Sequence, residues 1–264
     1  MKALKILFAI TGFYFLSLSA SAGIEVLGNT VYKNVSSKGE TYTGVIKIHN
    51  TGNKDQEASI YQRDYLFNYK GESRYDEPVS HNRSNSRWIR FNRQTLTLKG
   101  NETQDIQFEV AVPSSDTLKG TYWSLLMVEG VRPPDPNAKG QLNIHESIRF
   151  AIQIITNIGK SGTGQLEFQN PGIVKEGEKI FFDFVLLNTG ERLLSPDVSI
   201  ELFDDESGNS VAVLKAPKNG MYPTTSTKWR FPLEGLPKKS YKAVIVADCS
   251  GEDVFGLEYN IEIK

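Results

Sequence analysis

Apolar and polar residues alternate along short runs of this chain, and residues typical of turns separate the runs. Every second position is apolar in residues 106–112, 148–154 and 180–186. Such alternation places successive side chains on opposite faces of a strand, whereas a helix needs apolar residues three and four positions apart. No long stretch has the helical spacing. The pattern therefore predicts an all-β chain.

An internal repeat divides the chain into two halves. The same 11 positions separate Gly39 from Asn50 and Gly177 from Asn188, and an Asn-Thr-Gly turn closes both strands. A turn, a strand of fixed length and a second turn have thus been used twice. One supersecondary plan that is duplicated in this way predicts two domains.

Each half opens a late strand with a tyrosine, Tyr122 in the first half and Tyr241 in the second. At that corner of an immunoglobulin-like sandwich, a tyrosine can bury its ring and bond to the nearby backbone. Glycines and short polar side chains in residues 157–164 indicate a linker. We therefore predict two tandem immunoglobulin-like β-sandwich domains, residues 23–158 and residues 159–264.

The first 22 residues have the pattern of a secretory signal peptide. Lys2 and Lys5 precede the apolar residues 6–18, and a small-residue Ala-Ser-Ala sequence ends at Ala22. The apolar run is shorter than the roughly 20 residues that span a bilayer, and no later run could serve. We expect cleavage after Ala22 and export without a membrane span. The periplasm is the favoured location, with the cell surface or secretion as alternatives.

The charge balance weighs against nucleic-acid binding, and the cysteine content excludes an intramolecular disulfide. Without the signal peptide the chain carries 28 basic and 31 acidic side chains. This small acidic excess gives no attraction for nucleic acid. Cys249 is the only cysteine, so an intramolecular disulfide is excluded. Its position two residues after an apolar run favours a structural thiol over a reactive one.

The first half is the longer one. Asn50 and Tyr122 are 72 positions apart, whereas Asn188 and Tyr241 are 53 apart, and most of the 19 extra residues can be assigned to residues 69–87. Long insertions in a sandwich are usually surface loops, where functional residues concentrate. We expect a surface loop here, with a functional role and a merely solvated segment as equal alternatives.

A candidate ligand site follows this insertion, where arginines surround aromatic residues. Arg87, Trp88 and Arg90 could stack on a sugar or a base, or hold a carboxylate. The same pattern suits a strand that enters the core with Trp88 while the arginines are solvated, which we favour. The near-neutral charge of the chain weighs against nucleic acid in particular.

The sequence lacks signals for catalysis, metals or cofactors. Its three histidines, His49, His81 and His145, are far apart and have no partner at metal-ligand spacing. The acidic residues 204–206 precede Gly208 and predict a hairpin turn rather than a cation site. No nucleophile elbow, phosphate loop or zinc-protease motif is present. We predict a non-enzymatic protein without catalytic residues, metal or cofactor.

Residues 121–156 carry the most informative pattern. A long strand opens at Tyr122, a proline-rich break beginning Arg-Pro-Pro follows at Arg132, and the next strand carries Ile-Arg-Phe around Arg149. This arrangement resembles the N-terminal domain of PapD-like periplasmic pilus chaperones, in which Ile-Pro-Pro stands at the break. The resemblance implies a chaperone-like factor for pilus or other envelope-protein assembly. Its partner would be another envelope or pilus protein.

The resemblance also implies site residues. In that family the last strand lends alternating apolar side chains to an unfinished pilin, and a basic residue anchors the C-terminal carboxylate of the pilin. The matching positions here are Leu142 and Ile144 for the lent side chains and Arg149 for the anchor. Gly140 stands where a third lent side chain is expected, and a second basic residue expected near Thr30 is missing. Such strand addition uses main-chain bonds for affinity and alternate side chains for fit.

The apolar positions that follow have a second interpretation. Four alternate side chains suit a strand that faces the core of its own domain, which we favour for Ile148, Phe150, Ile152 and Ile154. Leu142 and Ile144 follow the proline-rich break instead. These two are the better candidates for an exposed edge.

The pairing of the two halves is also similar to the WxL-interacting proteins of Gram-positive surfaces. Arg-Trp-Ile at Arg87, Leu-Thr-Leu at Leu96 and a strand that ends at Pro113 carry this resemblance. It implies a cell-surface or peptidoglycan-binding module as the alternative function. The ligand site would then be the region around Arg87.

Overall fold

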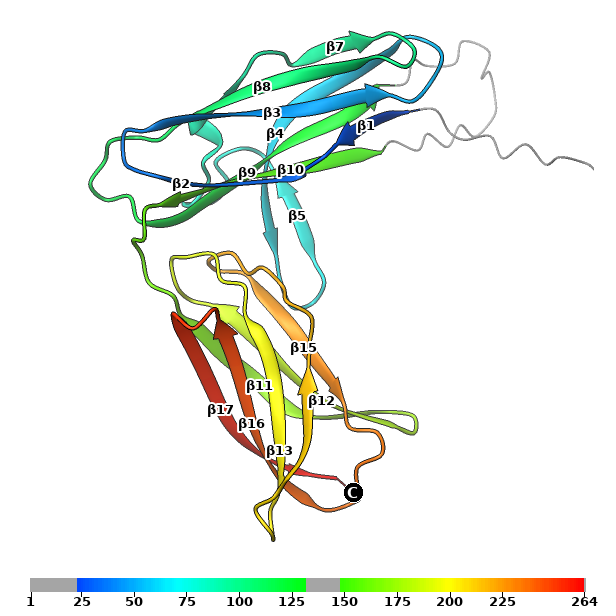
Figure 1. Ribbon diagram of the computed structural model, residues 1–264, viewed down its shortest axis with the longest axis vertical. Coiled ribbons are helices and arrows are strands. Elements are labelled where there is room, and N and C mark those ends of the chain that lie inside the picture. Colours follow the sequence, from blue (N-terminus) through cyan, green and yellow to red (C-terminus); the bar gives the residue numbers. More distant parts are fainter. Residues whose placement is uncertain (1–22, 132–147, 264) are drawn as a thin grey trace, which may run out of the picture.

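The computed structural model describes residues 23–131 and residues 148–263 (Figure 1). Apart from turns and one short 3-10 helix, the described chain consists of strands, so the predicted all-β class is confirmed. In this part of the chain, no helix is long and apolar enough to cross a membrane. The expected signal peptide, residues 1–22, lies outside the described residues, and so do three predicted site positions, Gly140, Leu142 and Ile144.

The first half of the chain forms one β-sandwich. Its two sheets have the strand orders β1-β3-β8-β6 and β2-β10-β9-β4-β5, and β7 also pairs with β4. The two sheets enclose buried side chains that alternate along the strands, among them Ile46, Ile60 and Leu126. The elements are β1 (Ile24–Leu27), β2 (Val31–Ser36), β3 (Thr41–Asn50), β4 (Gln56–Phe67), β5 (Ser73–Asp76), η1 (Ser86–Trp88), β6 (Ile89–Phe91), β7 (Thr95–Leu98), β8 (Thr103–Ala111), β9 (Gly120–Val131) and β10 (Arg149–Ile158).

The second half forms another sandwich, with sheet orders β11-β12-β15 and β14-β13-β16-β17. Its core is rich in aromatic rings, including Phe182, Phe184 and Trp229. The predicted architecture of two tandem immunoglobulin-like sandwiches is thus confirmed. The strands are β11 (Leu166–Glu176), β12 (Lys179–Asn188), β13 (Asp197–Asp204), β14 (Ser210–Lys215), β15 (Ser226–Pro232), β16 (Ser240–Cys249) and β17 (Asp253–Glu262).

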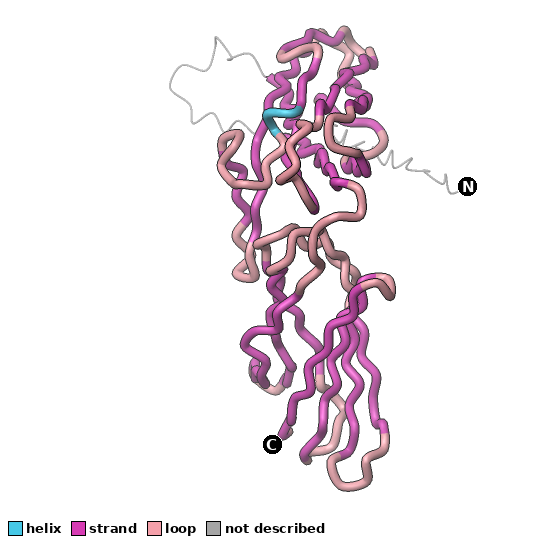
Figure 2. Tube along the Cα trace, turned by 90° about the vertical axis from the view of Figure 1, so that its left-hand side faces the viewer, coloured by secondary structure: helices cyan, strands magenta, loops and turns pink. Residues whose placement is uncertain are grey.

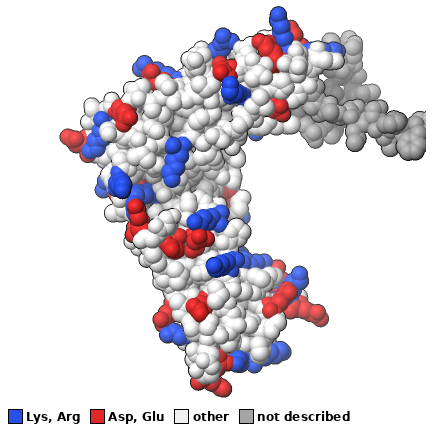
Figure 3. Space-filling view, viewed as in Figure 1, with Lys and Arg blue, Asp and Glu red and all other residues white. Residues whose placement is uncertain are grey.

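The two sandwiches meet at their ends and lie at an angle to each other (Figures 1 and 2). The chain passes from one to the other after β10, which includes Asn157 and Ile158 from the predicted linker. On the face shown in Figure 3, basic and acidic side chains are interspersed over both sandwiches. Such a surface fits the near-neutral charge of the sequence.

The repeated Asn-Thr-Gly turn has a structural cause. Asn50 is fully buried, and its side-chain nitrogen donates to three backbone carbonyls. Asn188 is also fully buried and donates to the carbonyls of Arg192 and Met221, each at 2.8 Å. In both turns the side-chain oxygen accepts the N–H of the glycine two residues later. These two amides satisfy backbone groups that the turns would otherwise leave buried without a partner.

The two tyrosines at the late strands differ in their burial. Tyr241 is buried, and its hydroxyl donates to the carbonyl of Pro237 at 2.8 Å. Tyr122 is only half-buried and packs on Trp88, with ring centroids 4.7 Å apart. On β9 the next residue, Trp123, takes the fully buried position. The expected tyrosine corner is therefore found in the second half only.

Residues 69–87 are not a plain surface loop, because part of them forms β5. This strand pairs antiparallel with the end of β4, and the hairpin between Phe67 and Ser73 projects toward the second sandwich (Figure 1). There the N–H of Tyr69 donates to the hydroxyl oxygen of Ser226 at 3.1 Å. The extra residues of the first half thus build a bridge between the two halves.

Candidate functional site

β10 changes its neighbours along its length. On one side it pairs with β9 over all of Arg149–Ile158. On the other side β2 runs parallel to it, but only from Gln153 to Ile158. Within the described residues, the four residues from Arg149 to Ile152 therefore lie on an open sheet edge. An open edge presents unpaired backbone groups to any strand that adds there.

The direction of the backbone hydrogen bonds identifies the groups that face outward. The N–H of Gln153 donates to the carbonyl of Thr30 at 2.8 Å, toward β2. Successive residues of a strand direct their backbone groups to opposite sides, so Ala151 points the same way as Gln153. At Ala151 no strand of the described chain occupies that side. Its N–H and C=O are the central backbone groups of the open edge.

Burial along β10 agrees with the predicted packing of alternate side chains against the core, except at the start of the strand. Ile152 and Ile154 are fully buried, and Phe150 packs against the same core. Ile148 is 63% exposed, so the prediction of core packing is wrong for this residue. It precedes the first pairing of β10 with β9, which is Arg149 with Glu129.

Arg149, the predicted anchor, begins β10 beside the open edge. Its Nε lies 3.0 Å from Oε1 of Glu129 on the neighbouring strand. The hydroxyl of Tyr61 donates to the other oxygen of Glu129 at 2.9 Å. Together with Met127 and Ala151, these side chains border a hollow of about 570 Å³ on the outer face of the sheet. The guanidinium is therefore ion-paired yet half-exposed, and it lies at the opposite end of β10 from the joint of the sandwiches.

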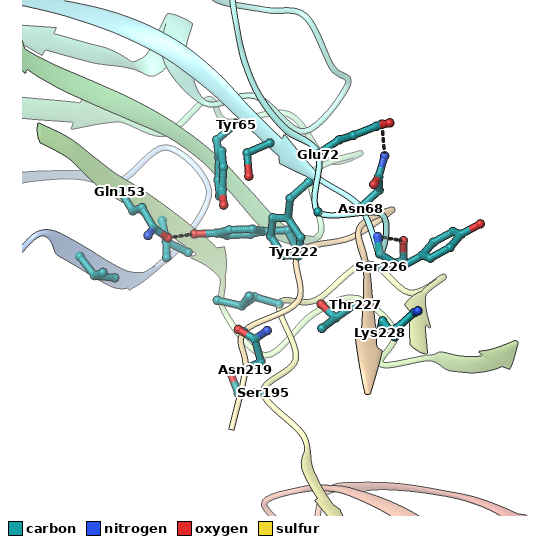
Figure 4. A pocket seen from close by; sticks show the side chains of 18 of the residues that line it. Tyr65, Asn68, Glu72, Gln153, Ser195, Asn219, Tyr222, Ser226, Thr227 and Lys228 are labelled. Carbon is teal, nitrogen blue, oxygen red and sulfur yellow. Dashed lines mark hydrogen bonds between the residues drawn. The ribbon is translucent and has the colours of Figure 1, made fainter. Parts of the chain in front are cut away.

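A larger cleft of about 660 Å³ lies between the two sandwiches (Figure 4). Lys33 of β2 and Gln153 of β10 contribute to it from the first sandwich. The hairpin of β4 and β5 forms one wall, and residues 219–228 of the second sandwich form another. Gln153, which lines the cleft, directly follows the open segment of β10, so the open edge ends beside the cleft.

The charges of the cleft favour an anionic group. Among its described lining residues, Lys33 and Lys228 are basic and Glu72 is acidic. Glu72 accepts a hydrogen bond from Asn68 at 2.7 Å, and the ammonium of Lys228 is 3.5 Å from Asp183. Lys33 is exposed on the outer face of β2. A carboxylate that entered the cleft would gain a charge-assisted hydrogen bond from such a lysine.

Tyr222 fixes the floor of the cleft. Figure 4 shows its hydroxyl end pointing to Gln153, with Tyr65 above the ring. Burial, with a smaller contribution from Tyr65, raises the pKa of Tyr222 well above its usual range. The hydroxyl therefore stays protonated and donates to Oε1 of Gln153. The ring stacks on Trp123 of the first sandwich, with centroids 4.6 Å apart.

Backbone hydrogen bonds tie the two sandwiches together beside the cleft. The N–H of Thr121 donates to the carbonyl of Glu191 at 2.8 Å, and the hydroxyl oxygen of Thr121 accepts the N–H of Leu193 at 2.8 Å. The ammonium of Lys119 lies 2.8 Å from the Glu191 carboxylate, and this hydrogen bond lowers the pKa of Glu191. The two sandwiches are therefore joined by direct contacts beside the cleft.

The predicted ligand group around Trp88 lies elsewhere in the fold. Trp88 ends η1 and packs partly against the first core, whereas Arg87 and Arg90 are exposed. Arg90 belongs to β6, an edge strand of the sheet that does not contain β10. The structure does not bring these residues together with Arg149. A ligand role for Arg87 and Arg90 stays a prediction.

Sequence reasoning missed the residues of the cleft. The second basic residue that the resemblance implies near Thr30 is missing there, and Lys33 lies three positions later on β2. The sequence of β2 gives no clear signal for this, because Val31 and Val35 share the outward face of Lys33. Gln153 and Tyr222 come from different sandwiches and meet only in the folded chain. No local pattern marks such a pair.

The acidic turn at residues 204–206 is occupied by its own hydrogen bonds. One oxygen of Asp204 accepts the N–H groups of Glu206 and Ser207 at 3.1 and 2.8 Å, and the other is paired with Lys239. Across the described ranges, no group of three or more His, Cys, Asp or Glu side chains could hold a metal ion. Burial raises the pKa of the Cys249 thiol to about 11, which suits a structural thiol.

Neither a family model nor a curated protein matches the chain. Among solved structures, it is similar to a chain of the chaperone–tip adhesin complex of CFA/I fimbriae biogenesis, with 13% sequence identity, a TM-score of 0.49, and coverage of 90% of this chain and 98% of that one. The class 5 fimbriae chaperone CfaA shares 15% identity at a TM-score of 0.45, with coverage of 90% and 98%. A chain of the CsuC–CsuE chaperone–tip adhesion subunit complex of Acinetobacter baumannii shares 13% identity at a TM-score of 0.44, with coverage of 89% and 97%. Function therefore has to be inferred from the residues and geometry of the chain itself.

Proposed function

We propose that this chain is an exported, non-enzymatic binding protein that assists the assembly of pili or of another envelope protein by strand addition at β10. The open edge from Arg149 to Ile152 carries the proposal, because a free strand edge can bind an extended segment through its backbone. The resemblance of residues 121–156 to PapD-like pilus chaperones supports the same mechanism. The periplasm is the proposed location.

The position of β2 defines how far an added strand can run. The added strand would lie beside Arg149–Ile152 and reach the point where β2 begins to pair, at Gln153 and Val31. From there on β2 occupies the neighbouring place, so the partner segment has to end or turn away at the cleft. Lys33 and Lys228 are suited to receive a carboxylate at this point.

Leu142 and Ile144 remain the proposed side chains that the strand lends to its partner. They precede β10 in the sequence, a few residues before its open edge begins at Arg149. Gly140 leaves the third lending position without a side chain. Arg149 is proposed as the basic contact at the edge, and Lys33 adds a second basic group at the cleft.

Ala151→Pro tests this function. Proline removes the N–H that faces the open side, and edge strands tolerate proline at such a position because no bond to the neighbouring strand is lost. We expect the variant to keep its β-type circular dichroism spectrum and to lose the partner that co-purifies with the chain from its own envelope extract. Ala151→Val keeps the N–H and should retain that partner.

Two further variants test the lent side chains. Leu142→Asp and Ile144→Asp place charges where apolar side chains should enter the partner, so each should lower the recovery of the partner at least tenfold, the effect of about 1.4 kcal/mol. If folded Ala151→Pro and both aspartate variants retain the partner as well as the unaltered chain does, strand addition at β10 is wrong.

A further inference from the structure

Three rings from three segments of the chain stack where the two sandwiches meet. His81 lies on Trp123 with ring centroids 4.4 Å apart and an angle of 29° between the planes. Tyr222 of the second sandwich also stacks on Trp123, with ring centroids 4.6 Å apart and an angle of 15° between the planes. The indole N–H of Trp123 donates to the carbonyl of Tyr65 at 2.7 Å. The imidazole thus contacts the ring of the first sandwich that stacks on Tyr222.

The hydrogen bonds of His81 identify its neutral form. Nδ1 accepts the N–H of Arg83 at 3.3 Å, so the proton of the neutral ring is on Nε2. Nε2 is buried and has no hydrogen-bond partner in the described part of the chain. The nearest carboxylate oxygen, Oδ2 of Asp64, lies 3.8 Å away, beyond hydrogen-bond range. Only 12% of the His81 side chain is exposed.

Asp64 is held in place by other donors. Its Oδ2 accepts the N–H and the hydroxyl of Ser80 at 2.7 and 3.2 Å, and its Oδ1 accepts the hydroxyl of Ser84 at 2.6 Å. The carboxylate is fully buried. It therefore cannot move toward His81 without giving up these bonds.

The other charged groups near His81 are already paired. Asp76 on β5 lies 2.5 Å from Arg74. The guanidinium of Arg83 lies 3.5 Å from Glu191 in the second sandwich. Burial lowers the pKa of His81 below its ordinary value, and the negative charges of Asp64 and Asp76 offset this only in part.

We propose that His81 is a pH-sensitive latch between the two sandwiches: the neutral ring holds Trp123 against Tyr222, and protonation in acid loosens this joint. The imidazolium would carry a second N–H at Nδ1, directed at the N–H of Arg83, inside a largely enclosed site. The repulsion between the two N–H groups and the burial of the charge both disfavour the stacked position of the charged ring. The latch concerns the joint alone and does not depend on strand addition at β10.

The direction of the pH dependence follows from linkage. The folded chain holds the proton of His81 less tightly than the unfolded chain does, because the folded pKa lies below the ordinary value of 6.5. The stability that the neutral His81 ring contributes to the folded chain is therefore fully present above that value. It is lost as the pH falls from 6.5 through the folded pKa, and under the proposal this loss falls on the joint.

An NMR titration of the mature chain, residues 23–264, tests the latch. The ring signals of His81 report its protonation, and residual dipolar couplings report the orientation of the two sandwiches, from about pH 7.5 to about pH 5. We expect a His81 midpoint below 6.5 and a change of orientation that follows the same titration. Couplings that stay constant while His81 becomes protonated would overturn the proposal.

Two variants separate the latch from general acid effects. His81→Phe keeps a ring on Trp123 but cannot be protonated, so its couplings should be the same at both ends of the titration. His49→Gln removes a histidine of β3 that is bonded to Thr103 and should leave the pH dependence intact. An acid-induced change in His81→Phe equal to that of the unaltered chain contradicts the latch.

Asp76→Asn supplies a second measurement that needs no change to the stack. The Asp76 charge raises the pKa of His81, so its removal should shift both the ring titration and the orientation change to lower pH. An orientation midpoint that stays in place while the ring midpoint moves would assign the acid response to another group and exclude His81 as the latch.

Discussion

Single buried amides hold the turns that close the repeated strand of each sandwich. Asn188 donates to two carbonyls and accepts one N–H while fully buried. Asn188→Ala leaves these backbone groups without partners, so we expect the free energy of unfolding to fall by about 2–4 kcal/mol. Urea unfolding followed by tryptophan fluorescence measures this change. The exposed Asn209→Ala should stay within about 0.5 kcal/mol of the unaltered chain. Equal changes in the free energy of unfolding for the two variants would contradict a structural role of Asn188.

Residue spacing predicted the repeat of these turns but not their cause. The 11 positions from Gly177 to Asn188 are visible in the sequence, whereas the carbonyls that Asn188 binds come from a turn and from Met221, 33 positions away. The burial of the β10 side chains was likewise predicted only as far as the local pattern determines it. Alternation identified Ile152 and Ile154 as core residues, because strand period is a local property. It could not show that Ile148, which continues the same alternation, is exposed in the fold.

The hairpin of β4 and β5 is the element that distinguishes the first sandwich from the second. Replacing residues 68–72 by Asn-Gly keeps the pairing of Phe67 with Ser73 and supplies a favoured two-residue turn. It removes the bond from Tyr69 to Ser226, so the amides at the start of β15 should exchange their hydrogens several-fold faster. Hydrogen-exchange mass spectrometry measures this. Lys70→Ala changes only an exposed side chain at the tip and should leave β15 unaffected. Unchanged exchange in the shortened hairpin would show that it does not brace the second sandwich.

Strand type was easier to predict than strand neighbours. Comparing the two halves assigned the extra residues to 69–87 as a surface loop, because these polar residues lack the alternation that marks a strand. β5 forms there through its pairing with β4. The open segment of β10 was likewise hidden, since it results from where β2 begins to pair. A sequence shows which residues can form a strand, and the fold decides which edges stay open.

The function proposed for the whole molecule needs both sandwiches in a fixed relation. The open edge belongs to the first sandwich, whereas the cleft at its end takes Tyr222 and Lys228 from the second. The binding of a partner segment that runs from the edge into the cleft would therefore depend on the angle between the two sandwiches. Gly120 and Thr121 approach the backbone of Glu191 closely at the joint, so we expect this contact to contribute to the angle.

Gly120→Ala tests whether this backbone contact sets the angle. Gly120 has a φ of +73°, and a Cβ added there would overlap the carbonyl of Glu191. Gly235 has a φ of +80° with nothing within 4 Å, so Gly235→Ala is the matched control for the strain alone. Each alanine should cost about 1–2 kcal/mol of stability through its left-handed backbone. Only Gly120→Ala should also force the sandwiches apart, which small-angle X-ray scattering would record as an altered curve at unchanged molecular mass. If both variants scatter as the unaltered chain does, the angle is set by the ring stack around Trp123 instead.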